Sequence, residues 1–227
     1  MELSKSSTTW VSDVREPSKI ANKCVEVTRT ATAYFSRLVF RSCEEEDLQS
    51  SDCVVLDWRL RYREPHQFHV NQFMSPSDLD EWISIGPETY QNAGFWFRDK
   101  DDSHKDHNQI LLTDECLRFL KAGEPLSAAI YRFSGENFVL LEYDTTEFQE
   151  GVLHDLLAEN PLISSSNIEI WVHYETTFLA KAALTFGGRD SDDNEIYGDQ
   201  QHLFSGYNTD IRISPPQNYS VLTNNDD

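Results

Sequence analysis

The sequence predicts a mainly β protein with short helices, most simply an antiparallel β-sandwich of the jelly-roll type, with an α+β domain as the alternative. Apolar and polar residues alternate strictly over residues 56–63, and residues 168–178 place Ile168, Ile170 and Val172 on one face, which is typical of strands with one buried face. Strands do not alternate regularly with long crossover helices. A doubly wound parallel sheet is therefore disfavoured.

Charge and composition divide the 227 residues into three parts. Residues 1–23 form a mixed-charge, Ser- and Thr-rich segment that we expect to be a flexible arm, and residues 24–186 form the β-rich core domain. Residues 187–227 are acidic and contain Gly and Pro pairs, which predicts a partly disordered tail. The net charge of −20 disfavours nucleic-acid binding, because it repels phosphate backbones unless basic residues cluster locally.

The first half of the core domain is expected to contain two strands and two helices. Residues 25–40 are rich in β-branched and aromatic residues and predict a strand, and residues 56–63 predict the second. Ser75 followed by Pro76 resembles a helix start, and that helix would end before Gly86. A second helix would begin at Thr113 and end near Gly123.

The second half is expected to contain a hairpin, a helix and a strand. Residues 128–133 and 138–143 predict the hairpin, with Gly135 in its turn. Thr146 would cap a helix that ends before Pro161. In the final strand, 168–178, Ile168 and Ile170 would share one face while Trp171 lies on the other.

Three arginines, Arg59, Arg61 and Arg63, fall on one face of the strand at 56–63 and are the candidate binding residues. Like charges repeated along a strand need counter-charges. The simpler interpretation is cross-strand pairing with acids such as Glu142, Asp144, Glu169 or Glu175. The alternative is recognition of an acidic partner surface or of a phosphate.

Two acidic runs are candidate metal sites, because calcium prefers several carboxylate oxygens close together. Neither run completes an EF-hand loop, so the alternatives are a weak calcium site and a solvated acidic loop. The candidate ligands are Asp99, Asp101, Asp102, Asp190, Asp192 and Asp193.

Two His-x-x-His pairs, His66 with His69 and His104 with His107, raise the separate hypothesis of a metal-dependent hydrolase, although solvated loop histidines are the simpler interpretation. The chain lacks G-x-S-x-G, P-loop, G-x-G-x-x-G and H-E-x-x-H motifs. We therefore predict a protein that is not an enzyme.

Cysteine spacing and the first residues predict a cytoplasmic location. The four cysteines, Cys24, Cys43, Cys53 and Cys116, are irregularly spaced and contain no C-x-x-C pair, so we expect reduced thiols. The first residues do not pair a basic flank with an apolar run, and no apolar run approaches the ~20 residues of a membrane helix.

Two short patches carry a resemblance to a known family. DWRLRYREP at 57–65 and NIEIWVHYETTF at 167–178 resemble an early and the last shell strand of the single jelly-roll coat proteins of small icosahedral plant RNA viruses, the tombusvirus-like and sobemovirus-like group. The predicted helix at 75–83 falls where that fold places one. The resemblance implies self-assembly, a virion location and calcium between subunits. Two features depart from the family pattern: the arm is nearly neutral instead of basic, and the acidic tail is additional.

These observations favour a non-enzymatic, self-associating structural protein, a homo-oligomer and viral capsid subunit. The alternative is an acidic cytosolic binding or inhibitor protein that engages a basic partner through electrostatic steering.

Overall fold

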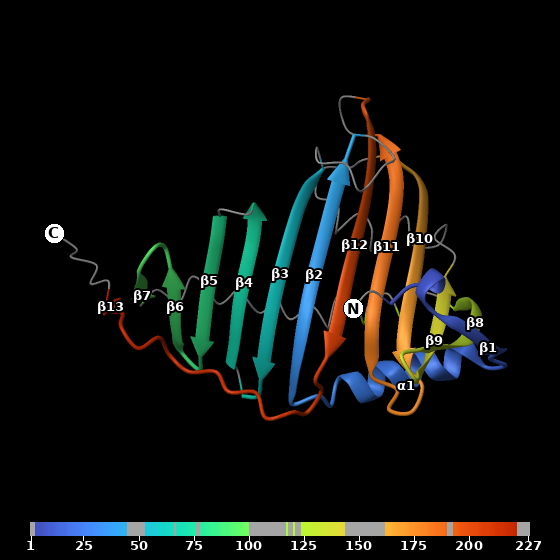
Figure 1. Cartoon of the computed structure of the whole chain (residues 1–227), viewed down its shortest axis with the longest axis horizontal. Helices are drawn as coiled ribbons and strands as arrows, with labels where there is room; N and C mark the ends of the chain where they lie inside the picture. The colour runs from blue at the N-terminus through green and yellow to red at the C-terminus, as the bar shows by residue number, and fades with distance from the viewer. Residues whose placement is uncertain are drawn as a thin grey trace. The chain divides into compact units, whose positions relative to one another are not determined.

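The computed structural model describes residues 3–44, 53–65, 67–75, 78–99, 117, 120, 124–143, 162–189 and 193–221 (Figure 1). The chain divides into two compact units. Unit 1 comprises Met1–Thr30, Val39–Val55 and Thr113–Leu203, and unit 2 comprises Ala31–Leu38, Leu56–Leu112 and Phe204–Asp227.

Unit 1 is an antiparallel sheet with one α-helix packed against it. Its elements are η1 (Lys5–Ser7), β1 (Thr9–Asp13), α1 (Pro17–Thr28), β8 (Pro125–Phe133), β9 (Glu136–Tyr143), β10 (Leu162–His173), β11 (Leu179–Arg189) and most of β12 (Glu195–Ser205). The strands pair in the order β1-β8-β9-β10-β11-β12. Helix α1 contacts β8 and β11.

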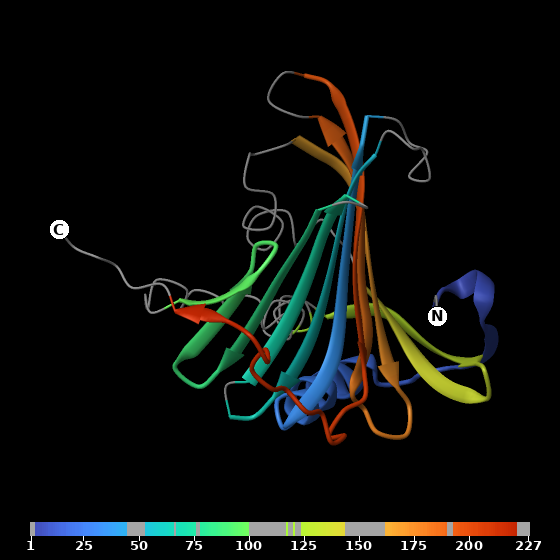
Figure 2. The same ribbon diagram turned by 60° about the vertical axis from the view of Figure 1, so that its left-hand side comes forward.

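Unit 2 is a strand meander closed by a returning segment. It contains the first part of β2 (Ala33–Cys43), most of β3 (Val54–Arg63), then β4 (Gln67–Ser75), β5 (Asp78–Ile85), β6 (Glu88–Asn92), β7 (Trp96–Asp99) and β13 (Ser220–Val221). Figures 1 and 2 show the segment after β12 running past the ends of β3, β4 and β5. It ends in β13, which pairs parallel with β7.

The described strands all belong to a single sheet of thirteen strands, with β2 between β12 and β3. The prediction of a mainly β protein is confirmed. The prediction of a two-sheet, jelly-roll-like sandwich is wrong, because the two alternating runs lie in the same sheet. Alternation reports that one face of a strand is buried, but it does not report whether a second sheet covers that face.

The hairpin and the arginine-bearing strand form as predicted. Residues Ser134 and Gly135 connect β8 to β9 with φ of 51° and 90°, the left-handed values that a two-residue hairpin turn of this kind requires. In β3, Leu60 is buried while Arg59 and Arg61 are exposed, so the side chains alternate between the two faces.

The helix predicted from Ser75 is absent, because β4 and β5 pair as a hairpin there. Ser75 with Pro76 gives a helix-start pattern, but the pairing of residues 78–85 with β4 outweighs it. Trp82 lies opposite Val70 and Ile83 lies opposite His69, so consecutive side chains pack on opposite faces. Packing therefore overrides the local helix signal.

Both terminal segments differ from their predictions. Residues 1–23, predicted as a flexible arm, contain β1 and the start of α1, and the strand predicted from residue 25 begins only after α1 ends at Thr28. Residues 187–227, predicted as a partly disordered tail, contain the end of β11, all of β12 and β13. The strand predicted at 168–178 is confirmed in β10, which ends at His173.

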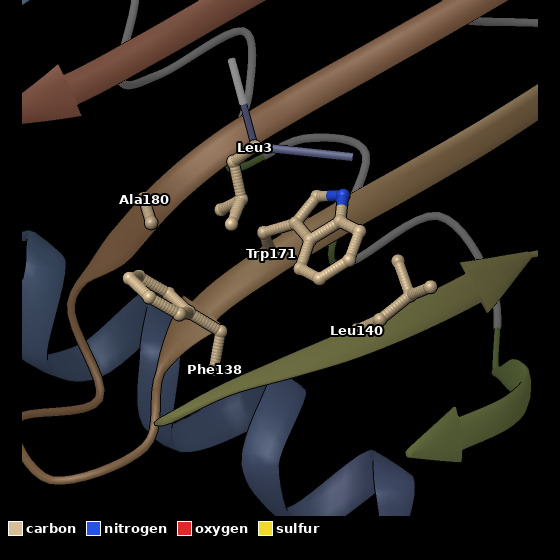
Figure 3. Packing of buried hydrophobic residues seen from close by; sticks show 5 residues of the cluster. All are labelled: Leu3, Phe138, Leu140, Trp171 and Ala180. Atoms are coloured by element: carbon tan, nitrogen blue, oxygen red, sulfur yellow. The ribbon is translucent and has the colours of Figure 1, made fainter. Parts of the chain in front are cut away.

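The core of unit 1 lies on both faces of its central strands. Residues 138–141 of β9 are all at most 1% exposed, so side chains pointing to either face are covered. On the face that carries Trp171, Leu3 packs with Phe138, Leu140 and Ala180 (Figure 3). The buried Lys181 ammonium donates to the Leu3 carbonyl oxygen at 2.8 Å, and Lys5 pairs with Glu142. The N-terminal strap, residues 3–8, is thus fixed by apolar and polar contacts.

The prediction of reduced cysteines is wrong for two of them. Cys43 and Cys53 form a disulfide within unit 1. Their irregular spacing concealed it, because pairing depends on the distance between Cα atoms in the fold. Cys24 is a free, buried thiol on α1, and burial raises its pKa to about 12. Cys116 lies outside the described residues.

The helices predicted from Thr113 and Thr146 lie mainly outside the described residues. Of the first, Leu117 is helical, and both Leu117 and Leu120 are buried. In the described part of the chain, no helix has the length and apolar composition that crossing a membrane requires.

Candidate functional site

A narrow apolar cleft lies on one face of unit 1, over the neighbouring strands β10, β11 and β12. Ile170 lies opposite Ala182, and Ala182 lies opposite His202, so these three side chains share a face. We call it the cleft face. The residues that line the cleft are Ile168, Ile170, Ala182, Ala183, Leu184, Gln200 and His202.

The lining is apolar except for one pair of polar side chains. Ile168, Ile170 and Leu184 are at most 3% exposed, and the lining includes no Asp, Glu, Lys or Arg. The free volume is only about 10 Å³, roughly the space of one water molecule. The cleft is therefore nearly closed, and the small side chain of Ala182 sits at its middle strand.

Gln200 and His202 provide the polar pair. They are two residues apart on β12 and so point to the same face, and the Gln200 Nε2 lies 2.6 Å from the His202 Nε2. Burial lowers the pKa of His202 to about 3, so its imidazole is neutral at physiological pH. A neutral imidazole and a carboxamide can each donate and accept one or more hydrogen bonds.

The opposite face of the same strands is charged where the cleft face is apolar. Asp199 is buried, receives hydrogen bonds from the Arg41 guanidinium at 3.2 and 3.3 Å, and accepts another from Gln201 Nε2 at 2.7 Å. Charged groups are thus separated from the cleft by the thickness of the sheet.

Unit 2 contains a second, polar depression with a volume of about 550 Å³. Its lining includes Thr32, Arg63, Glu64, Asn208 and Asp210. Several of these polar groups already bind one another: Asn208 Oδ1 accepts from Thr32 N at 2.8 Å, and Arg63 Nη1 lies 3.6 Å from Asp210 Oδ1. The depression combines two carboxylates with one guanidinium and so favours no single ligand charge.

The structure places the three candidate arginines on β3. Arg59 donates to Asp57 at 2.9 Å and lies 4.7 Å from the centre of the Phe73 ring. Arg61 lies opposite His69, and Arg63 donates to the Ile211 carbonyl oxygen at 2.9 Å. In the described part of the chain, Asp57 pairs with Arg59 and Asp210 pairs with Arg63; of the acids named from the sequence, Asp144 lies outside the described residues. Recognition of a phosphate or an acidic partner by these arginines stays a prediction.

The candidate calcium ligands are mostly outside the described residues; these are Asp101, Asp102, Asp190 and Asp192. Asp99 ends β7, and the exposed Asp193 accepts from Arg189 at 2.9 Å. Calcium binding stays a prediction.

Of the paired histidines, His69 is described, and its Nε2 lies 2.6 Å from a Glu81 oxygen; His66, His104 and His107 are outside the described residues. Among the residues that the structure describes, no three His, Cys, Asp or Glu side chains are grouped to hold a metal ion.

Sequence reasoning missed the Gln200–His202 pair, because the residues of β12 fall in the segment predicted to be a partly disordered tail. The available signal was weak: in EIYGDQQHLFS, apolar residues occur only at the two ends of the strand. Ile168 and Ile170 were correctly placed on one face, but nothing in their spacing identified the cleft.

Comparisons with known proteins find solved structures that are similar to this chain at low sequence identity. No family model matches the chain, and no curated protein matches it. Among solved structures, the lipoprotein LppX of Mycobacterium tuberculosis is 12% identical, with a TM-score of 0.48, over 87% of this chain and 97% of that chain. A LolA superfamily protein from Nitrosomonas europaea is 10% identical, with a TM-score of 0.31, over 89% and 96%.

A third solved structure is MucB in complex with MucA, with 12% identity and a TM-score of 0.36 over 92% of this chain and 62% of that chain. None of these three neighbours is a viral coat protein. The single sheet is not the two-sheet jelly roll of those coat proteins, so it overturns the coat-protein resemblance, and the capsid, virion and self-assembly predictions that depended on that resemblance are wrong.

The prediction of a cytoplasmic location, and with it that of a cytosolic inhibitor, is also wrong. The Cys43–Cys53 disulfide is typical of oxidising compartments and not of the reducing cytosol.

Proposed function

We propose that this chain is a non-enzymatic binding protein that takes an alkyl or acyl chain against the cleft face of unit 1. The observation that carries the proposal is a narrow cleft on the sheet face, lined by buried aliphatic side chains and by one polar pair, the half-buried Gln200 and the buried His202. Small-molecule sites are mostly apolar and contain a few placed polar groups. The proposal rests on this cleft and not on the structural neighbours.

An ordinary core explains the aliphatic side chains but not the polar pair. Protein cores rarely contain polar side chains, because burying a polar group costs free energy that its hydrogen bonds only partly return. His202 is 2% exposed, at a position where an aliphatic residue would pack against Ala182 without that cost. A ligand that forms hydrogen bonds with Gln200 and His202 would explain why polar side chains occupy these positions.

Entry of a ligand requires the cleft to widen, since its free volume is about 10 Å³. When a pocket is nearly closed without ligand, its open state becomes populated if the ligand binds that open state better than the closed one. We therefore expect binding to be accompanied by a measurable change in hydrogen exchange on β10 and β11.

The test uses the full chain, the uncharged dye Nile red and dodecanol as competitor. We expect saturable dye fluorescence at one site, displaced by dodecanol. Ala182→Leu fills the cleft and should weaken dye binding at least about tenfold, because the added methyl groups occupy the space of the ligand. Thr185→Leu is the matched control: it adds a leucine to the same strand at an exposed position of the opposite face.

Circular dichroism establishes that each variant is folded. The proposal is wrong if dodecanol does not displace the dye from the unsubstituted protein, or if Ala182→Leu and Thr185→Leu bind the dye equally well.

A further inference from the structure

We infer that the cleft selects an uncharged amphiphile, a long-chain alcohol or ester, and excludes the corresponding carboxylate. Gln200 is the residue that forms a hydrogen bond with the ligand's polar group. This inference rests on the proposed function and names the ligand class of the same site.

The exclusion of a charged head group follows from the composition of the cleft. Its lining contains no cationic side chain, and the buried charges nearest along β12 and β11, Asp199 and Lys181, point to the opposite face. Lys181 is directed to the Leu3 carbonyl oxygen there. An ionised carboxylate would therefore lose its hydration in the cleft without gaining a counter-charge.

Recognition of an uncharged polar group follows from the hydrogen-bonding chemistry of Gln200 and His202. As placed, the Gln200 amide donates to the Nε2 of His202, which leaves the amide carbonyl oxygen to accept from a ligand hydroxyl. If the amide is rotated by half a turn, its carbonyl oxygen accepts from the N–H of the neutral tautomer that carries its proton on Nε2. The NH₂ group of the amide can then donate to an ester carbonyl. Gln200 therefore suits either an alcohol or an ester, because the neutral imidazole serves as donor or acceptor.

Gln200 is the better placed of the two residues to contact a ligand. It is half-buried, whereas His202 is 2% exposed and lies opposite Ala182. Leu184 lies directly opposite Gln200, so an alkyl chain whose polar end meets Gln200 can continue over Leu184 and Ile168. His202 then acts as a positioning residue that holds the amide.

The experiment compares dodecanol, methyl laurate and laurate as competitors of Nile red at a mildly alkaline pH, where laurate is ionised. We expect dodecanol and methyl laurate to compete at similar concentrations and laurate to need at least about 100-fold more, because a buried unpaired charge costs much more than a neutral group. Laurate competing within about threefold of dodecanol would overturn the inference.

Two neighbouring glutamines provide matched variants. Gln200→Leu should weaken dodecanol binding about tenfold, after correction for the variant's own Nile red affinity, since a net hydrogen bond contributes at about this level. Gln201→Leu, whose side chain binds Asp199 on the opposite face, should leave dodecanol binding unchanged. If Gln200→Leu is not folded, Gln200→Met replaces it. Unchanged dodecanol binding in a folded Gln200 variant would also overturn the inference.

The two failures are distinguishable. If no competitor displaces the dye from the unsubstituted protein, the proposed function is wrong. If the competitors displace it without regard to charge or to Gln200, only the ligand class is wrong.

Discussion

Removing the Cys43–Cys53 disulfide should destabilise unit 1 by an amount that its loop length sets. The two cysteines are 10 residues apart in the sequence. In the chain-entropy model, closing a loop of this length lowers the entropy of the unfolded chain enough to stabilise the folded state by about 2.7 kcal/mol at 25 °C. We expect Cys43→Ala/Cys53→Ala to lower the free energy of unfolding by about this amount.

Urea unfolding, followed by circular dichroism with and without reductant, measures this effect. The unsubstituted protein should lose stability when reductant is added, and the double variant should be insensitive to it. If reductant leaves the unsubstituted protein unchanged, or if all four cysteines of the denatured chain react with a thiol reagent without reduction, the disulfide and the reasoning from it are wrong.

Three further substitutions test other contacts. Burial favours the neutral form of the Asp57 carboxyl group, but hydrogen bonds from Arg37 and a second arginine outweigh this effect and lower the pKa of Asp57. The carboxylate therefore stabilises the folded state above the pKa of the unfolded chain, and this stabilisation is lost as the pH falls through the pKa of the folded state. Asp57→Asn should therefore cost about 1 kcal/mol near neutral pH and less at acidic pH, by urea unfolding at both. Gly198→Ala places a Cβ 2.4 Å from an aromatic carbon and 2.9 Å from a backbone oxygen, and should lower the Tm. Lys181→Met leaves the Leu3 carbonyl without this donor and should speed hydrogen exchange of the N-terminal strap, measured by mass spectrometry.

Period-two patterns were the part of the fold that could be read from the sequence. They identified β3 and β10, because one face of each strand carries consistently apolar residues. The β8–β9 hairpin was identified by a different signal, two β-rich runs separated by a turn that contains Gly135. The pattern failed for β12, where Gly198, Asp199 and Gln201 have buried or half-buried positions without being apolar. Their environment depends on partners such as Arg41, which is distant in the sequence.

The candidate site was less predictable than the strands that carry it. Ile170 and Trp171 are both fully buried on opposite faces of β10, so the alternation could indicate neither which face packs a core nor which face opens into a cleft. The cleft also depends on the β10–β11–β12 register. Register is a property of pairing between segments, and local propensity does not contain it.

The division of the chain has a consequence for its synthesis. Both units are assembled from three separate stretches, and unit 2 takes its last stretch from Phe204 onward. A nascent chain that has already released residues 56–112 therefore still lacks the β13 partner of β7 until Ser220 and Val221 have been synthesised. Because segments of each unit interrupt the other in the sequence, no contiguous fragment contains one whole unit without part of the other.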